Sequence, residues 1–239
     1  MAGITRGLME ALNLIVNLDA EIYGIIGLTL LVTMTSTLIS TLLGVPLGML
    51  VGSSTFRLKN LVVRSINAFM GLPPVVAGLF VYLLLTRTGP FGSFELLFSV
   101  PAMVIAQVLI VTPIIAGLTI SAIRLKLKPV RETCEGLGLR KGKTMRLLLF
   151  ECRYPILSAV AAGFGRAIAE VGAIMLVGGN IQYKTRVMTT AIVLETGKGN
   201  YGKALALGIL LLGISFAVNW FINIIQERES YEDRSEKSA

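Results

Sequence analysis

Two charged residues, Arg166 and Glu170, lie in a stretch of the sequence that otherwise carries no charge, residues 156–183. Opposite charges four residues apart share one face of a helix and can pair there. Ionisable side chains are costly in apolar surroundings, so they usually pair or face a water-filled cavity. Two interpretations stay open: a neutralised pair that locks helices together, or an Arg166 cation beside the path of a tetrahedral dianion, with Glu170 adjusting its charge.

Two neutral polar residues follow this pair. Asn180 and Gln182 lie at the end of the same stretch, and their amides could donate hydrogen bonds to an anion. We interpret Asn180 as a possible residue of the outer end of such a path. The alternative is that both side chains are solvated in a loop.

A second uncharged stretch, residues 65–86, contains Gly71-Leu72-Pro73-Pro74. Proline has no N–H, so Pro73 and Pro74 remove two successive backbone donors and predict a helix break. A broken helix at membrane depth must face protein or a water-filled cavity. The break either lines a pathway or is a structural kink.

A charged segment rich in glycine, Arg131–Lys143, lies between two apolar stretches. Pro129 suits the first turn of a helix, and Val130, Cys134 and Leu137 follow at helical spacing. Gly138 suits a left-handed helix cap. We predict a short amphipathic helix that begins at Lys128-Pro129. It either receives force from a soluble partner or lies on anionic lipid without one.

Enzymatic chemistry is not supported by the composition. The sequence has no His, and no Ser/Lys or paired-carboxylate arrangement lies in the apolar stretches. The segment Gly138–Thr144 resembles a phosphate-binding loop only superficially, because that motif needs glycine where Leu137 stands. We expect no catalytic residue, no metal site and no bound cofactor in this chain. The formal charge of +8 does not indicate nucleic-acid binding, because the basic residues flank apolar stretches.

The elements that must position these groups are membrane helices. The chain is 54% hydrophobic and only 15% charged, which is unusual for a soluble domain. Five long stretches exceed the roughly 20 residues that cross a bilayer as a helix, and spans in lipid must be helical. We predict an all-α polytopic membrane protein, with one transmembrane domain over residues 24–226. Its five helices fall at residues 24–51, 65–86, 96–123, 156–183 and 204–226.

Lys and Arg residues predict the orientation. Fifteen of them fall in residues 52–64, 124–153 and 227–239, and six fall in the other connecting segments. Cytoplasmic loops carry the excess of positive charge. This favours an external N-terminal segment, residues 1–23, a cytoplasmic loop, residues 124–153, and a cytoplasmic C-terminus. The charged tail, residues 227–239, is low in apolar residues, and we expect it to fray.

The charged segment resembles the EAA loop of ABC importer permeases, whose pattern is Glu-Ala-Ala-x-x-x-Gly, then about nine residues and Ile-x-Leu-Pro. Glu132 and Gly138 match this pattern, and small residues replace the two alanines, whereas Glu151 replaces the final proline. The resemblance implies a coupling helix that docks into a separate ATPase subunit. That helix comprises Glu132, Thr133, Cys134, Glu135, Gly136, Leu137, Gly138 and Leu139.

A second segment is similar to the fourth-span signature of the sulfate/molybdate/tungstate permeases. It reads Gly165-Arg166-Ala167-Ile168-Ala169-Glu170-Val171-Gly172-Ala173, followed by Gly178-Gly179-Asn180. Together with the missing proline after the loop, it is most similar to tungstate-type permeases. The resemblance implies the fold of a type I ABC importer permease and an oxyanion substrate.

These observations predict a multi-pass permease subunit in the cell membrane that imports tungstate. Five helices are few for a gated path, so we expect a homodimer. The resemblance implies two ABC ATPase subunits that carry ATP and Mg²⁺, and an extracytoplasmic solute-binding protein. Molybdate or sulfate could replace tungstate. From other classes, a membrane scaffold with a lipid-bound loop and an ATP-independent channel stay open.

Overall fold

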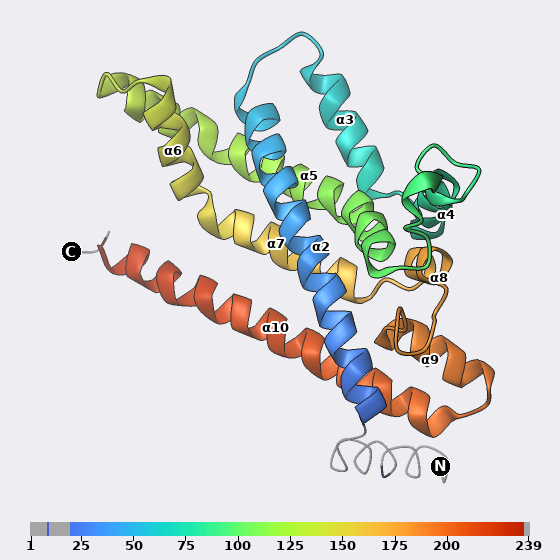
Figure 1. Ribbon diagram of the computed structural model, residues 1–239. Helices are drawn as coiled ribbons and strands as arrows, with labels where there is room; N and C mark the ends of the chain where they lie inside the picture. Colours follow the sequence, from blue (N-terminus) through green and yellow to red (C-terminus); the bar gives the residue numbers. More distant parts are fainter. Residues whose placement is uncertain (1–8, 10–19, 237–239) are drawn as a thin grey trace. The chain divides into compact units, whose positions relative to one another are not determined.

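The computed structural model describes residue 9 and residues 20–236, so most of the predicted external segment, residues 1–23, lies outside the described residues. Within them, regular structure is helical throughout, apart from turns (Figure 1). The elements are α2 (Ala20–Ser53), α3 (Lys59–Met70), α4 (Pro74–Leu85), the 3₁₀ turn η1 (Gly92–Phe94), α5 (Val100–Gly136), α6 (Lys141–Glu151), α7 (Arg153–Ile168), α8 (Gly172–Gly178), α9 (Met188–Gly197) and α10 (Tyr201–Glu236).

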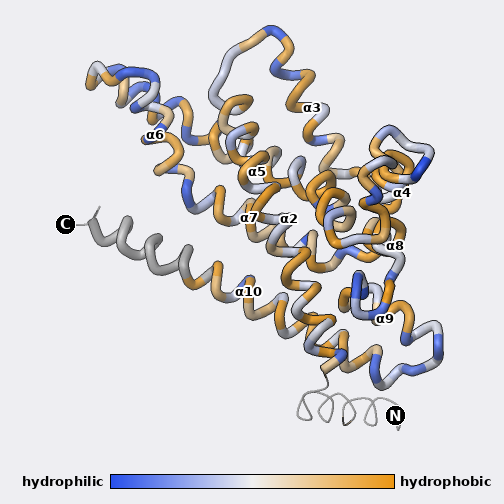
Figure 2. Tube along the Cα trace, in the orientation of Figure 1, coloured by the Kyte–Doolittle hydropathy of each residue, from blue (hydrophilic) through white to orange (hydrophobic). Residues whose placement is uncertain are grey.

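Three helices of the described chain are long and apolar enough to cross a membrane: α2, α5 and α10 (Figure 2). They contain most of the first, third and fifth predicted spans. Two more spans result if α3 with α4, and α6 with α7, each form one bent span, with bends of 99° and 60°. On that count the number of spans agrees with the five predicted.

The fourth predicted span, residues 156–183, is wrong as a single helix. Helix α7 ends at Ile168, and α8 begins at Gly172 and has only seven residues. The interruption contains Glu170, whose carboxylate accepts a hydrogen bond from the amide of Ala173 near the start of α8. The bent pair that could form the fourth span consists of α6 and α7, residues 141–168. This span therefore begins and ends earlier in the chain than the predicted residues 156–183.

Two further helix boundaries differ from the prediction. A helix does not begin at Pro129: α5 continues through Pro113 and Pro129 to Gly136. The continuous helix puts Val130 and Cys134 in a buried cluster with Ile123, Leu148, Cys152 and Ile156, and this packing outweighs the missing proline donor. Similarly, α10 is helical to Glu236, where we expected the tail to fray.

The described chain divides into two compact units. Among the described residues, the first comprises residue 9 and residues 20–36, 73–109 and 165–218, and the second comprises residues 37–72, 110–164 and 219–236. In the first unit, Ile22 and Ile25 of α2 pack with Met188 and Ala191 of α9 and Leu207 of α10. The hydroxyl of Thr29 accepts a hydrogen bond from the Met188 amide at 2.9 Å, which fixes the start of α9.

In the second unit, glycines of α2 lie directly against α5. A Cβ at Gly44 would lie 3.1 Å from Ile115, one at Gly48 would lie 2.6 Å from Thr119, and one at Gly52 would lie 2.9 Å from Ile123. The three glycines recur every fourth residue and therefore form one helix face. Small residues at this spacing allow two membrane helices to approach closely, and the close approach places the second half of α5.

Candidate functional site

The interruption between α7 and α8 is a polar site in the first unit. Glu170 is only 4% exposed, and its Oε2 lies 3.8 Å from Nη2 of Arg166, whose side chain is 41% exposed. Its Oε1 accepts a hydrogen bond from the amide of Ala173 at 3.2 Å. Arg166 and Glu170 therefore pair, but they do not share a helix as predicted, because α7 ends between them. A carboxylate at the start of α8 is favourable electrostatically.

Side chains from other helices donate hydrogen bonds to backbone carbonyls at this interruption. Gln107 of α5 donates its amide hydrogen to the carbonyl of Ala167 at 2.9 Å and accepts one from the hydroxyl of Ser36 of α2 at 2.6 Å. Thr189 donates its hydroxyl to the carbonyl of Glu170 at 2.9 Å. Non-helical backbone at membrane depth requires such internal partners.

The helix that follows the proline break, α4, packs against α8. The backbone leaves the helix between Met70 and Pro74, as predicted, and Pro74 begins α4. A Cβ at Gly78 of α4 would lie 2.5 Å from Cα of Ala173, so α4 and α8 are in backbone contact at this point. Helix α4, which begins at Pro74, therefore packs against the short helix whose Ala173 amide donates a hydrogen bond to Glu170.

Asn180 lies just after α8 and has a positive φ of 51°. Its Nδ2 donates to the carbonyl of Thr190 at 3.4 Å, and its Oδ1 has no hydrogen-bond partner among the described residues. Gln182 donates to Glu21 at 3.0 Å. Among the described residues, the Asn180 amide is therefore held by a hydrogen bond through its nitrogen alone.

In the second unit, the predicted coupling segment ends α5 in a Schellman motif. Gly138 has a φ of +65°, the Leu139 amide donates to the carbonyl of Cys134 at 2.9 Å, and the Gly138 amide donates to that of Glu135 at 3.1 Å. This pair of bonds defines the motif. Leu139 also packs on the cluster that contains Cys134. The left-handed cap at Gly138 is confirmed.

The remaining side chains of the segment point away from this core. Leu137 is 70% exposed. Glu132 lies 3.9 Å from Lys128, and Glu135 lies 2.8 Å from Arg131; all four side chains are more than half exposed. Thr133 is exposed as well. The end of α5 thus presents one apolar side chain among charged groups on a rigid turn.

Comparison with known proteins gives the family. Residues 44–231 match the model of the binding-protein-dependent transport system inner membrane component, which is most of the chain. The chain belongs to this family of inner-membrane ABC permeases. It is 40% identical over 227 residues to the tungstate uptake system permease protein of Peptoclostridium acidaminophilum, covering 95% of this chain and 100% of the relative. It is 36% identical to the tungstate uptake system permease protein of Campylobacter jejuni, covering 91% of each.

The fold of the permease also has a counterpart among solved structures. The crystal structure of an amino acid ABC transporter with histidines superposes with a TM-score of 0.63, covering 90% of this chain and 96% of that one, at 18% sequence identity. At this identity the likeness shows the fold alone. The predicted all-helical ABC permease fold is confirmed.

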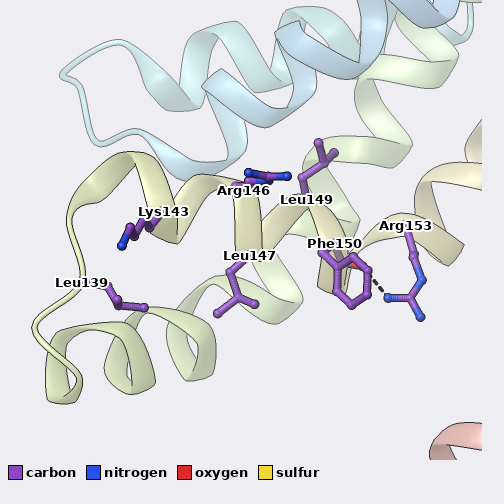
Figure 3. Close-up of a pocket in the computed structure, with 7 residues that line it drawn as sticks. All are labelled: Leu139, Lys143, Arg146, Leu147, Leu149, Phe150 and Arg153. Atoms are coloured by element: carbon purple, nitrogen blue, oxygen red, sulfur yellow. Dashed lines mark hydrogen bonds between the residues drawn. The ribbon is translucent and has the colours of Figure 1, made fainter.

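A groove of the permease adjoins the segment through Leu139. Its cavity of about 650 Å³ is lined by Leu139, Leu147, Leu149, Phe150, Lys143, Arg146 and Arg153. Figure 3 shows Lys143 next to Leu139, and Arg153 next to Phe150. The guanidinium of Arg153 lies 3.9 Å from the centre of the Phe150 ring, within reach of a cation–π interaction. The groove is therefore apolar in its walls and positively charged at its ends.

Sequence reasoning missed several polar residues that the permease brings together. Gln107 is 1% exposed in the middle of α5, and a lone amide in an apolar span is a signal that could have found it. Glu21 binds Arg186 and Lys203, which are 165 and 182 residues away. No local spacing could have indicated these ion pairs.

Proposed function

We propose that this chain is the permease subunit of an ATP-driven importer of an oxyanion, and that the oxyanion is tungstate. The observation that carries the proposal is the 40% identity to a tungstate uptake permease over 95% of the chain. The pair of half-exposed Arg166 with buried Glu170 and the Schellman turn at Gly138 support it, because they lie at the two segments that resemble the oxyanion permeases. Molybdate and sulfate are the alternative substrates.

In this proposal the end of α5 is the coupling helix. Exposed Leu137 would enter an apolar groove of a separate ATPase subunit, and Glu132, five residues earlier on α5, would add its charge to the contact. The Schellman motif keeps the turn rigid, and α5 is continuous from the turn into the candidate span. A movement of the docked turn would therefore be transmitted along α5 without a flexible link.

We further propose a homodimer that binds two ATPase subunits and an external solute-binding protein. Within one chain, the apolar window of α10 is 11% buried, whereas that of α5 is 61% buried. A second copy would cover part of this apolar surface and complete the path. ATP binding and hydrolysis on the partner subunits would switch the dimer between two states with different contacts, which is alternating access.

In this proposal Glu170 has a structural role beside the path of the anion. A buried carboxylate repels an oxyanion, so Glu170 is not a direct ligand in our proposal. Its role is to hold α8 and to orient Arg166, whose half-exposed guanidinium is the group that an oxyanion would meet. The break at Pro73 and Pro74 would line the same path by turning α4 onto α8.

Uptake by cells tests the coupling role. Gly138→Pro and Glu132→Arg should each abolish ATP-dependent tungstate uptake while membrane insertion persists. Among the described residues, Glu132 pairs with exposed Lys128, and an exposed ion pair contributes little to stability, so loss of uptake in this variant would report lost docking. Gly142→Pro is the matched control, because Gly142 lies in the first turn of α6, where proline is tolerated.

The result also separates the rival functions. Normal uptake and normal co-purification with the ATPase in both variants would refute the coupling role. A scaffold protein would form no complex with the ATPase and would take up no anion. A channel would conduct the anion without ATP. Competition among tungstate, molybdate and sulfate for uptake then identifies the substrate.

A further inference from the structure

We propose that Arg186 and Lys203 form an oxyanion-binding site, and that the carboxylate of Glu21 occupies this site in the present structure. The site lies in the first unit, in the region that the charge distribution predicts to be outside the membrane. The choice of tungstate as its ligand rests on the proposed function. The site itself rests on the geometry around Glu21.

At least three donors contact the two carboxylate oxygens of Glu21. Oε1 accepts hydrogen bonds from Nη1 of Arg186 at 3.3 Å and Nε2 of Gln182 at 3.0 Å. Oε2 accepts one from Nζ of Lys203 at 2.9 Å. A guanidinium, an ammonium and an amide are the donors that bind free oxyanions as well. They come from the turn before α9 and from the start of α10.

The charges of this cluster do not balance. Among the described residues, Arg186, Lys203 and Lys198 carry three positive charges, and Glu21 and Glu195 carry two negative charges, since Glu195 pairs with Lys198 and also interacts with Lys203. The side chains of Arg186, Glu21 and Lys203 are only 13%, 21% and 21% exposed, so solvent screens them incompletely. In addition, Nε of Arg186 is buried and has no hydrogen-bond partner in the described part of the chain. A tetrahedral dianion would balance Arg186 and Lys203 and could use this free donor.

There is space beside the carboxylate. A cavity of about 250 Å³ is lined by Glu21, Gly24, Ile25, Leu28, Gln182, Tyr183 and Arg186. Since an oxygen-sized group such as water takes about 30 Å³, the cavity can hold an anion with four oxygens. Gln182 and Arg186 line this cavity directly, and in our proposal the Glu21 side chain rotates away from Lys203 so that an anion also reaches the ammonium group.

The backbone that carries Arg186 is held firmly. The amides of Lys184, Thr185 and Arg186 all donate to the carbonyl of Ile181. The hydroxyl of buried Thr185 accepts from the Ile181 amide at 3.0 Å and donates to the carbonyl of Gly178. Arg186 is therefore positioned before any anion arrives, which reduces the entropic cost of binding.

Direct binding of tungstate tests the site. The full-length chain in lipid nanodiscs, without a solute-binding protein, is dialysed against sodium tungstate, and bound tungsten is measured by mass spectrometry. Glu21→Gln should bind tungstate at least about tenfold more tightly than the wild type, because the resident charge is gone. Arg186→Gln and Lys203→Gln, each added to Glu21→Gln, should reverse this gain. Equal affinity in all four proteins overturns the proposal.

Two glycine variants test the cavity without changing any charge. They differ in whether the new side chain enters the cavity. A Cβ at Gly24 or at Gly27 of α2 would meet no atom within 4 Å, so both positions accept a larger side chain. Only Gly24 lines the cavity. In the Glu21→Gln background, Gly24→Leu should weaken tungstate binding at least about tenfold, whereas Gly27→Leu should leave it unchanged. Equal binding by the two variants also overturns the site.

Failure of this inference is distinguishable from failure of the proposed function. Cellular uptake of tungstate with no binding at Arg186 and Lys203 would refute the site and leave the transport function standing. Binding at this site in a chain that supports no uptake of tungstate, molybdate or sulfate would retain the site and refute the transport function.

Discussion

The carboxylate of Glu170 accepts a hydrogen bond from the backbone amide of Ala173 at 3.2 Å, so a residue just beyond the end of α7 anchors the start of α8. A hydrogen bond to a charged group contributes about 1.5–3 kcal/mol. We expect Glu170→Ala to lower the free energy of unfolding by about this amount. Glu170→Gln should lose less, because its amide oxygen can still accept the bond. Thermal unfolding of the purified protein, followed by circular dichroism, measures both.

Arg166→Gln separates the two interpretations of the pair. If Arg166 lies at the oxyanion path, this variant should lose uptake even where the protein still inserts into the membrane, although the buried Glu170 carboxylate loses its cation and the unfolding temperature falls. Normal uptake with a lowered unfolding temperature would assign a purely structural role to Arg166.

The close contact between Gly48 and Thr119 leads to a further prediction. A Cβ at Gly48 would lie 2.6 Å from Cβ of Thr119 and 2.8 Å from the carbonyl oxygen of Ala116, so neither the side chain nor the backbone can yield cheaply. We expect Gly48→Ala to destabilise the protein by about 1–3 kcal/mol through overpacking, measured by thermal unfolding. Gly27→Ala on the same helix is the control, and it should be neutral or stabilising because a Cβ there meets nothing. Equal effects at both positions would contradict the close packing of α2 on α5.

The stability of the region around α9 should depend on pH through Glu195. Burial by itself would raise the pKa of this carboxyl, but hydrogen bonds from Lys198 and Asn200 outweigh burial and hold the pKa below its usual value. The stabilisation is therefore complete above the unfolded-state pKa of about 4.3 and is lost as the pH falls through the lower folded-state value.

We expect the unfolding temperature of the wild type to fall more steeply than that of Glu195→Gln as the pH is lowered from about 5 to about 3. Thermal unfolding across this range measures the difference. Parallel curves for the two proteins would show that Glu195 contributes no pH-dependent stability.

The buried thiols predict how the protein reacts with maleimides. Cys134 and Cys152 are free, and they are 1% and 0% exposed in the cluster that supports the coupling segment. We expect the native wild type to stay unlabelled and the denatured protein to be labelled. Thr133→Cys places an exposed thiol beside Cys134, and a membrane-impermeant maleimide should label it only in inside-out vesicles. Labelling in right-side-out vesicles would refute the predicted orientation and the coupling role with it.

Local patterns in the sequence predicted much of the architecture. Uncharged stretches longer than about 20 residues identified α2, α5 and α10, and the prolines at 73 and 74 identified the break before α4. The left-handed position of Gly138 followed from residue type, because only glycine adopts a positive φ without cost. The contact between Gly48 and Thr119 is seen in the folded chain, because glycines at every fourth residue permit a close helix contact but do not identify its partner.

What the sequence alone determined are properties of single segments: apolar length, the glycine turn and the excess of positive charge in the loop that contains Glu132. Tertiary structure decided where helices continue or stop. Packing of Val130 and Cys134 carries α5 through Pro129, whereas polar partners from α5 and α9 allow the chain to leave the helix at Glu170. The physical reason is that a backbone group in an apolar environment must find a partner, and a partner distant in sequence is visible only in the folded chain. The pairing of Glu21 with Arg186 and Lys203 arises in the same way.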